Sequence, residues 1–199
     1  MMIITIKEGF LYLREHREVA LIITVSAFVN FFLAGYNLFI PYTNIIMIGI
    51  VKDMYGKLLI AEAIGGILGS FINIRCKKDI TISYLLYLLG VSGTCLAFFS
   101  ITLSYFKLVF ILLLPIVLFN IFLTMFNIRL ISFIQQTVEI EYAGRVFSIV
   151  FTVALLFMPL GSILFSTIIN QFAIENYLII GSSITLLAII FEMIKKYAL

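Results

Sequence analysis

Residues 108–128 read LVFILLLPIVLFNIFLTMFNI, and no charged residue lies between Lys107 and Arg129. A helix crosses the hydrocarbon core of a bilayer with about 20 predominantly apolar residues. The stretch has that length and character, so it predicts a transmembrane helix over Leu108–Ile128.

The rest of the chain repeats this pattern on both sides. Stretches with few or no charges predict five further spans, at about Val19–Ile40, Leu58–Ile74, Ile80–Thr102, Val146–Ile168 and Tyr177–Ile194. Residues 1–18 precede the first span and place Ile6, Phe10 and Leu13 at helical spacing. Lys7–Glu18 predict a short amphipathic helix at the cytoplasmic membrane interface, with a solvated connector as the alternative.

The composition supports a membrane protein and excludes several soluble classes. Of the 199 residues, 63% are hydrophobic and only 12% are charged, against about 25% in an average soluble domain. Mean hydropathy is +1.22. So small a chain cannot hide this much apolar surface in one core. We therefore expect an all-α membrane protein, and not a soluble enzyme, a nucleic-acid binder or a secreted disulfide scaffold.

Catalytic and metal-binding patterns are not found in the sequence. His16 is the only histidine, and the two cysteines, Cys76 and Cys95, fall in a predicted loop and a predicted span. This excludes a Cys/His metal cluster and a Ser–His or Cys–His catalytic pair. We expect no enzyme activity, no metal and no cofactor.

The distribution of basic residues predicts the orientation. Six spans place both termini on one side, and that side holds 10 of the 13 Lys and Arg residues. Lys52, Lys57 and Lys107 lie on the other side. Because cytoplasmic loops carry an excess of Lys and Arg, we expect a cell-membrane protein with both termini in the cytoplasm.

Two spans carry polar side chains at helical spacing. The candidates for lining a central cavity are Ser26, Asn30 and Asn37 in the first span and Asn120, Thr124 and Asn127 in the fourth. The stretches NFFLAGYN (residues 30–37) and NIFLTMFN (residues 120–127) also resemble each other. The two spans run in opposite directions, as the corresponding helices of a 3+3 inverted repeat do. Alternatively, the amides only hydrogen-bond between helices, at about 0.6 kcal/mol each.

The second span contains AEAIGGILGS, residues 61–70. Its small residues predict close packing against another helix; they are Ala61, Gly65, Gly66 and Gly69. Glu62 lies beside them and is a proton-coupling candidate, because an ionised carboxylate inside a membrane is costly. The alternatives are a neutral Glu62 that is hydrogen-bonded to a Tyr or Asn, or one that reaches toward the surface near Lys57.

Five stretches of the chain share one resemblance: KEGFLYLREHREVALI (7–22), YGKLLIAEAIGGILGS (55–70), GSFINIRCKK (69–78), QQTVEIEYAGRVFSIV (135–150) and Pro159-Leu160-Gly161. Together they resemble the C-terminal half of a major facilitator superfamily transporter, in the drug and macrolide efflux branch. The third is similar to the loop signature G-x-x-x-D-R-x-G-[RK]-[RK], but Asn73 replaces the acid, Ile74 the arginine and Cys76 the glycine.

The resemblance implies a 3+3 inverted-repeat half of a twelve-helix fold, with a substrate path between the halves. The expected function is half of an efflux permease that exports a small amphipathic compound by proton antiport. Its partner would be an N-terminal six-helix half or a second copy of the chain. The alternatives are a non-transporting immunity or assembly factor, which binds partner helices through Gly65 and Gly69, and a non-functional fragment of a disrupted transporter.

Charged residues at the cytoplasmic side are candidates for an inward gate. They are Arg75, Lys77, Lys78, Glu139, Glu141 and Arg145. The alternative is that they are solvated charges that only set the topology, because exposed ion pairs contribute about 0–1 kcal/mol.

Overall fold

The computed structural model of the protein describes residue 9 and residues 11–47, 51–76, 78–105, 108–168 and 173–198. This part of the chain is helical and contains no strand. Six of its helices are long and apolar enough to cross a membrane, which confirms the predicted number of spans.

The helices follow one another with short connections. Their bounds are α2 Arg17–Phe39, α4 Met54–Arg75, α5 Ile82–Tyr105, α6 Val109–Thr137, α7 Ile140–Ile168 and α8 Glu175–Ala198. The sequence predicts that the first span ends at Ile40. In the structure, a 3-10 turn, Ile40–Tyr42, and the short helix α3, Thr43–Ile46, continue the helical path of α2 past that residue.

The helices extend beyond the predicted spans, most of all at one end of α6 and α7. Apolar residues continue after Arg129, and α6 runs on to Thr137. At the start of α4, Asp53 caps the helix, with its carboxylate accepting a hydrogen bond from the Gly56 N–H at 3.4 Å. Hydropathy alone marks the membrane-embedded core of a helix, and caps and polar turns extend it on either side.

The segment before α2 is described from residue 11 onward and at Gly9. It is helical up to Glu15, and Tyr12 and Leu13 are buried. The Tyr12 ring stacks on His16 at 3.9 Å and on Tyr142 of α7 at 4.7 Å. Ile6 and Phe10, predicted to share the apolar face, lie outside the described residues.

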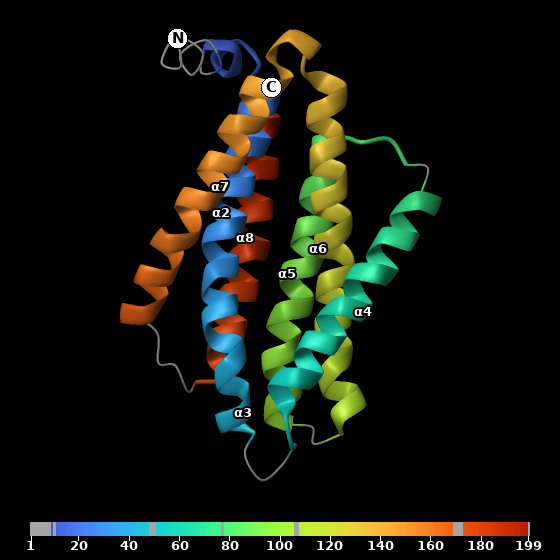
Figure 1. Cartoon of the computed structure of the whole chain (residues 1–199), viewed down its shortest axis with the longest axis vertical. Helices are drawn as coiled ribbons and strands as arrows, with labels where there is room; N and C mark the ends of the chain where they lie inside the picture. Colours follow the sequence, from blue (N-terminus) through green and yellow to red (C-terminus); the bar gives the residue numbers. More distant parts are fainter. Residues whose placement is uncertain are drawn as a thin grey trace.

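Successive long helices run in opposite directions, so α2 begins and α8 ends at the same end of the bundle (Figure 1). We call this end the terminal end. The α4–α5 and α6–α7 connections also lie there, and α3 lies at the opposite end.

The helices pack in a symmetric set of pairs. Helix α2 packs against α7 and α8, α5 packs against α6 and α8, and α4 packs against α6. If the first three long helices are matched in order with the last three, α2 corresponds to α6, α4 to α7 and α5 to α8. Under this correspondence, the α4–α6 pair becomes the α7–α2 pair, and the α5–α6 pair becomes the α8–α2 pair. The α5–α8 pair converts into itself.

Glycines allow three of these crossings to be close: α4 on α6, α7 on α2, and α5 on α8. A Cβ atom at Gly69 of α4 would lie 2.7 Å from the Ile121 carbonyl oxygen and 3.1 Å from the Thr124 Cβ on α6. At the α7–α2 crossing, a Cβ atom at Gly161 would overlap the Phe31 carbonyl oxygen and lie 3.0 Å from the Ala34 Cβ. Any larger side chain would force these helices apart.

The α5–α8 crossing is built from glycine on both helices. A Cβ atom at Gly93 of α5 would lie 2.7 Å from the Gly181 carbonyl oxygen, and one at Gly181 would overlap the Ala97 backbone nitrogen. The two backbones therefore approach each other directly at the centre of the bundle.

Candidate functional site

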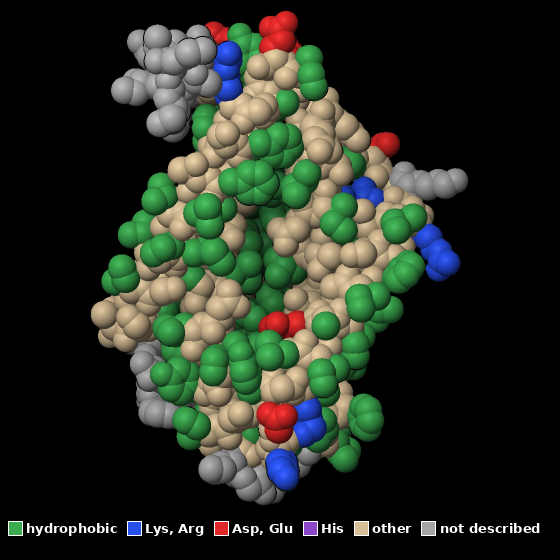
Figure 2. All heavy atoms as spheres, viewed as in Figure 1, with side chains coloured by type: hydrophobic (Ala, Val, Ile, Leu, Met, Phe, Trp, Pro, Cys, Tyr) green, Lys and Arg blue, Asp and Glu red, His purple; other side chains and the backbone are tan. Residues whose placement is uncertain are grey.

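One face of the bundle is hollowed. Figure 2 shows the hollow between α2 and α7 on one side and α4 and α6 on the other, with hydrophobic side chains along it. Helices α2 and α6 make little contact with each other, whereas each packs closely on other helices. The hollow therefore lies between the two helices that the sequence predicted to line a cavity.

Glu62 joins α4 to α2 within the membrane-spanning part of the bundle. Its side chain is half-buried, and its carboxylate Oε1 accepts a hydrogen bond from the Tyr36 hydroxyl. Tyr36 is only 3% exposed. The structure thus gives Glu62 a tyrosine partner, as one of the alternatives above expected. A hydrogen bond from Tyr36 is compatible both with a structural role of Glu62 and with proton binding.

Aromatic rings hold Tyr36 in place. Its ring meets the edge of Phe119 of α6 at 5.3 Å and of Tyr177 of α8 at 6.2 Å. The Tyr177 hydroxyl donates to the Phe39 carbonyl oxygen at 3.2 Å and lies 3.4 Å from Thr43 Oγ1. The Glu62–Tyr36 pair therefore packs against buried aromatic side chains of α6 and α8, and Tyr177 is in turn bonded to the end of α2.

The six cavity-lining candidates differ in their surroundings. Ser26 is buried, Asn30, Asn120 and Thr124 are half-buried, and Asn37 and Asn127 are exposed. The Asn30 amide donates to the Ser26 carbonyl oxygen at 2.9 Å, and the Asn120 amide donates to the Ile116 carbonyl oxygen at 3.1 Å. These bonds stay within one helix, so the two amides do not fasten helices together through them.

The small residues of α4 face α6. Ala61 is 2% exposed, and a Cβ atom at Gly65 would lie 2.6 Å from the Val117 carbonyl oxygen. Gly66 is half-buried, and Thr124 Oγ1 is the nearest atom to a Cβ placed on it, at 3.7 Å. The partner helix for this face therefore belongs to the same chain.

The gate candidates that the structure describes lie at the terminal end. No two of them form an ion pair with each other. Arg75, Lys78, Glu139 and Glu141 are exposed, and Lys77 lies outside the described residues. The Lys78 ammonium lies over the Tyr84 ring, 4.6 Å from its centroid, and the Arg145 guanidinium lies 5.4 Å from the centroid of Tyr142.

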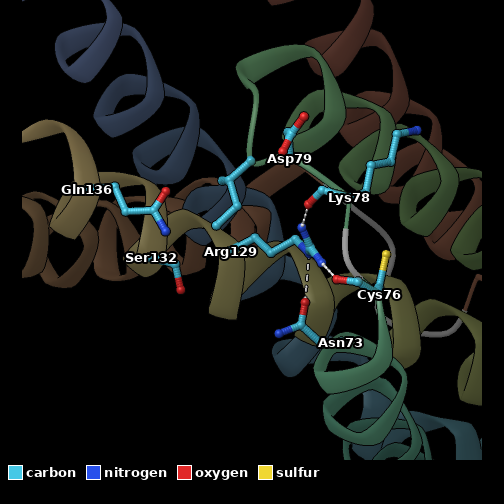
Figure 3. Close-up of a pocket in the computed structure, with 8 residues that line it drawn as sticks. Asn73, Cys76, Lys78, Asp79, Arg129, Ser132 and Gln136 are labelled. Carbon is cyan, nitrogen blue, oxygen red and sulfur yellow. Dashed lines mark hydrogen bonds between the residues drawn. The ribbon is translucent and has the colours of Figure 1, made fainter.

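Arg129 is a buried cation at the terminal end. From the sequence, it was counted only among the basic residues of that side. It is 4% exposed, and its guanidinium donates from Nε to Asn73 Oδ1 at 2.7 Å. Nη1 donates to the Lys78 carbonyl oxygen at 2.7 Å and Nη2 to that of Cys76 at 2.6 Å (Figure 3). These bonds fix the α4–α5 connection to α6.

A sequence signal for this role existed. Arg129 is followed by Leu130, Phe133 and Ile134 at helical spacing, which indicates that the helix continues and turns Arg129 toward the same side as these buried residues. The acceptors Cys76 and Lys78 are backbone carbonyls, and no side-chain pattern predicts those.

Cys76 lies beside this network. The hydrogen bond between its thiol and the Tyr84 hydroxyl, at 3.5 Å, lowers the pKa of Cys76, helped by a backbone hydrogen bond at Lys78 and by the nearby Arg129 charge. Cys95 lies within α5 and is half-buried.

No grouping of three His, Cys, Asp or Glu side chains that could hold a metal ion occurs in the described part of the chain. The sequence matches no protein-family model, and comparison with curated proteins and with solved structures gave no match.

Proposed function

We propose that this chain is a six-helix half of a secondary transporter of the major facilitator type, built as a 3+3 inverted repeat. It would export a small amphipathic compound in exchange for protons, with the hollow between α2 and α6 as its half of the substrate path.

The observation that carries the proposal is the repeated contact at the α4–α6 and α7–α2 crossings. Gly69 meets the carbonyl of Ile121, and Gly161 meets that of Phe31. Phe31 and Ile121 are the second residues of the two similar stretches, residues 30–37 and 120–127. The next neighbours, Ala34 and Thr124, also occupy equivalent positions, the fifth residue of each stretch.

The sequence around the glycines agrees with this pairing. Leu68-Gly69-Ser70 on α4 corresponds to Leu160-Gly161-Ser162 on α7. A shared tripeptide in a hydrophobic chain is weak by itself, but here both glycines make the same contact with corresponding residues. Internal repeats of opposite orientation are typical of secondary transporters, whose binding sites lie between the repeats.

The Glu62–Tyr36 pair supports proton exchange within this proposal. A carboxyl group inside a membrane usually faces a cavity or a partner and often marks a proton pathway. Rocking of one helix group against another would move the α2–α4 contact, and with it the exposure of Glu62 to either side. The alternative of a factor that binds partner helices through Gly65 and Gly69 is not favoured, because α6 occupies that face.

The proposal is tested with everted membrane vesicles that contain the full chain. An amphipathic fluorescent cation such as ethidium is supplied outside, and an inward-acid pH gradient is imposed. We expect uptake that stops when the gradient is collapsed, with the chain alone or together with an N-terminal six-helix half. Uptake equal to that of vesicles without the chain, for a panel of such compounds and in both combinations, would contradict the proposal.

A further inference from the structure

Arg129 is a buried cation whose described partners are all neutral. Asn73 contributes an amide oxygen, Cys76 contributes the carbonyl oxygen of the residue that caps α4, and Lys78 contributes a carbonyl oxygen of the α4–α5 connection. No ion pair with Arg129 occurs among the described residues. A charge taken out of water is costly unless an opposite charge or a full set of hydrogen bonds compensates it, and the carbonyls of a helix end do so only in part.

The guanidinium also retains hydrogen-bonding capacity. It has five N–H groups, and the three described bonds leave two of them for another acceptor. The guanidinium also lies over the Tyr84 ring, 5.0 Å from its centroid, which is a further neutral partner. Among the residues that the structure describes, Arg129 therefore has no counter-charge, and two of its N–H groups have no acceptor.

A pocket opens beside this group. Its volume is about 360 Å³, and Arg129, Lys78, Ser132 and Gln136 are among its lining residues (Figure 3). Asp79 also lines the pocket but forms no ion pair with Arg129. Figure 3 shows Ser132 and Gln136 on α6, on one side of Arg129, and the α4–α5 connection on the other. The Ser132 hydroxyl donates within α6 to the Ile128 carbonyl oxygen at 3.0 Å, so the side-chain donors that the pocket offers to phosphate oxygens are the Arg129 guanidinium, the Lys78 ammonium and the Gln136 amide.

The position of the pocket suggests where such a phosphate comes from. The pocket lies at the terminal end of membrane-spanning helices, where lipid headgroups lie, and basic pockets between such helices bind acidic headgroups. Ile80 is the apolar residue that lines the pocket, and the neighbours in sequence of Asn73 and Ser132, Ile74 and Ile131, are 78% and 39% exposed. An acyl chain can pack against apolar side chains of this kind.

We propose that the Arg129 pocket binds a phosphate-bearing anion, supplied as the headgroup of an anionic phospholipid. The phosphate would accept from the remaining guanidinium N–H groups and be held between the α4–α5 connection and α6. This inference does not depend on the proposed transport function.

The test measures binding of phosphatidylglycerol, phosphatidylcholine and inorganic phosphate to the purified full chain by native mass spectrometry and by thermal unfolding. We expect phosphatidylglycerol to bind at least tenfold more tightly than phosphatidylcholine and to raise the unfolding temperature by several degrees. Binding of inorganic phosphate without a preference for phosphatidylglycerol would assign the site to a soluble phosphate, and equal behaviour of all three would overturn the proposal.

Two variants separate binding from folding. Arg129→Lys keeps the charge but loses the planar set of donors, and Ser132→Leu fills the pocket while leaving the three bonds of Arg129 in place. Both should lower the preference for phosphatidylglycerol at least fivefold. Lys196→Gln removes an exposed charge of α8, outside the pocket, and should keep the preference. If Ser132→Leu keeps it too, the pocket is not the site.

Discussion

Glu62 is a polar residue of α4 whose chemistry depends on one partner. The Tyr36 hydroxyl donates to its carboxylate, and Tyr36 is itself buried among Phe119 and Tyr177. The residue as a whole is half-buried, and the Tyr36 hydroxyl is its one described hydrogen-bond partner. In the proposed function, this carboxyl group would receive and release the proton.

Glu62→Gln should abolish gradient-driven transport while preserving the fold. The amide keeps the size of the side chain and can still accept from Tyr36, but it cannot take up a proton. The measurement is gradient-driven uptake by everted vesicles at equal membrane abundance. Glu192→Gln is the control, because this carboxylate of α8 bonds to Ser83 and lies 3.9 Å from Lys195 at the terminal end. Unchanged uptake in Glu62→Gln would leave Glu62 as a structural hydrogen-bonding group.

Cys76 should be the more reactive of the two cysteines. Its lowered pKa means that a larger fraction is thiolate at neutral pH, and the thiolate is the form that reacts with maleimides. Tyr84→Phe removes the first cause of the shift, so alkylation of Cys76 should slow at pH 7 and recover as the pH rises toward the usual range for a thiol. Equal rates in Tyr84→Phe and the parent at pH 7 would show that the hydroxyl does not stabilise the thiolate.

At the scale of the helix, three crossings depend on glycine: α4 on α6, α7 on α2, and α5 on α8. The i, i+4 spacing of Gly65 and Gly69 predicted that this face of α4 packs closely against another helix, but it did not predict that the partner is α6. Gly161, Gly93 and Gly181 have no second glycine four residues away in their helices, so that spacing signal is missing and only the packed structure identifies their role. The partner of each glycine is a backbone carbonyl or amide, which the sequence does not distinguish from any other.

Gly69→Leu and Gly161→Leu should destabilise the bundle to a similar extent, by about 1–3 kcal/mol each, as overpacking typically does. The reason is that both glycines meet a carbonyl oxygen and a Cβ of corresponding residues on the facing helix. Thermal unfolding in detergent measures the effect. Leu68→Ile and Leu160→Ile are matched controls, because these side chains are 42% and 54% exposed and lie next to the glycines. A neutral Gly161→Leu would show that the two crossings are not equivalent.

At the scale of the whole molecule, hydropathy alone predicted the number of helices, because each span must bury its own backbone hydrogen bonds in lipid. Hydropathy did not predict which helices pack against each other. Lipid-facing and core-facing side chains are equally apolar in such a chain, so periodicity does not indicate which side of a helix meets a neighbour. Polar residues were the exception: Glu62 was singled out from the sequence, whereas Arg129 was counted only as a topological charge.

The orientation of the bundle gives the last prediction. Both the positive-inside distribution and the shared end of α2 and α8 lead us to expect the terminal end in the cytoplasm. Cys76 is a native label for that end, since it follows α4 directly and its lowered pKa favours the reactive thiolate. An impermeant maleimide should therefore leave Cys76 unmodified in intact cells and modify it after permeabilisation.

Asp53→Cys in a Cys76→Ser background provides the opposite label. Asp53 is exposed at the start of α4, one membrane crossing away from Cys76. It should react in intact cells at the same rate as after permeabilisation. Modification of Cys76 from outside, together with protection of the cysteine at position 53, would show that the molecule has the opposite orientation in the membrane. It would then place the Arg129 pocket in the outer leaflet and the α3 end in the cytoplasm.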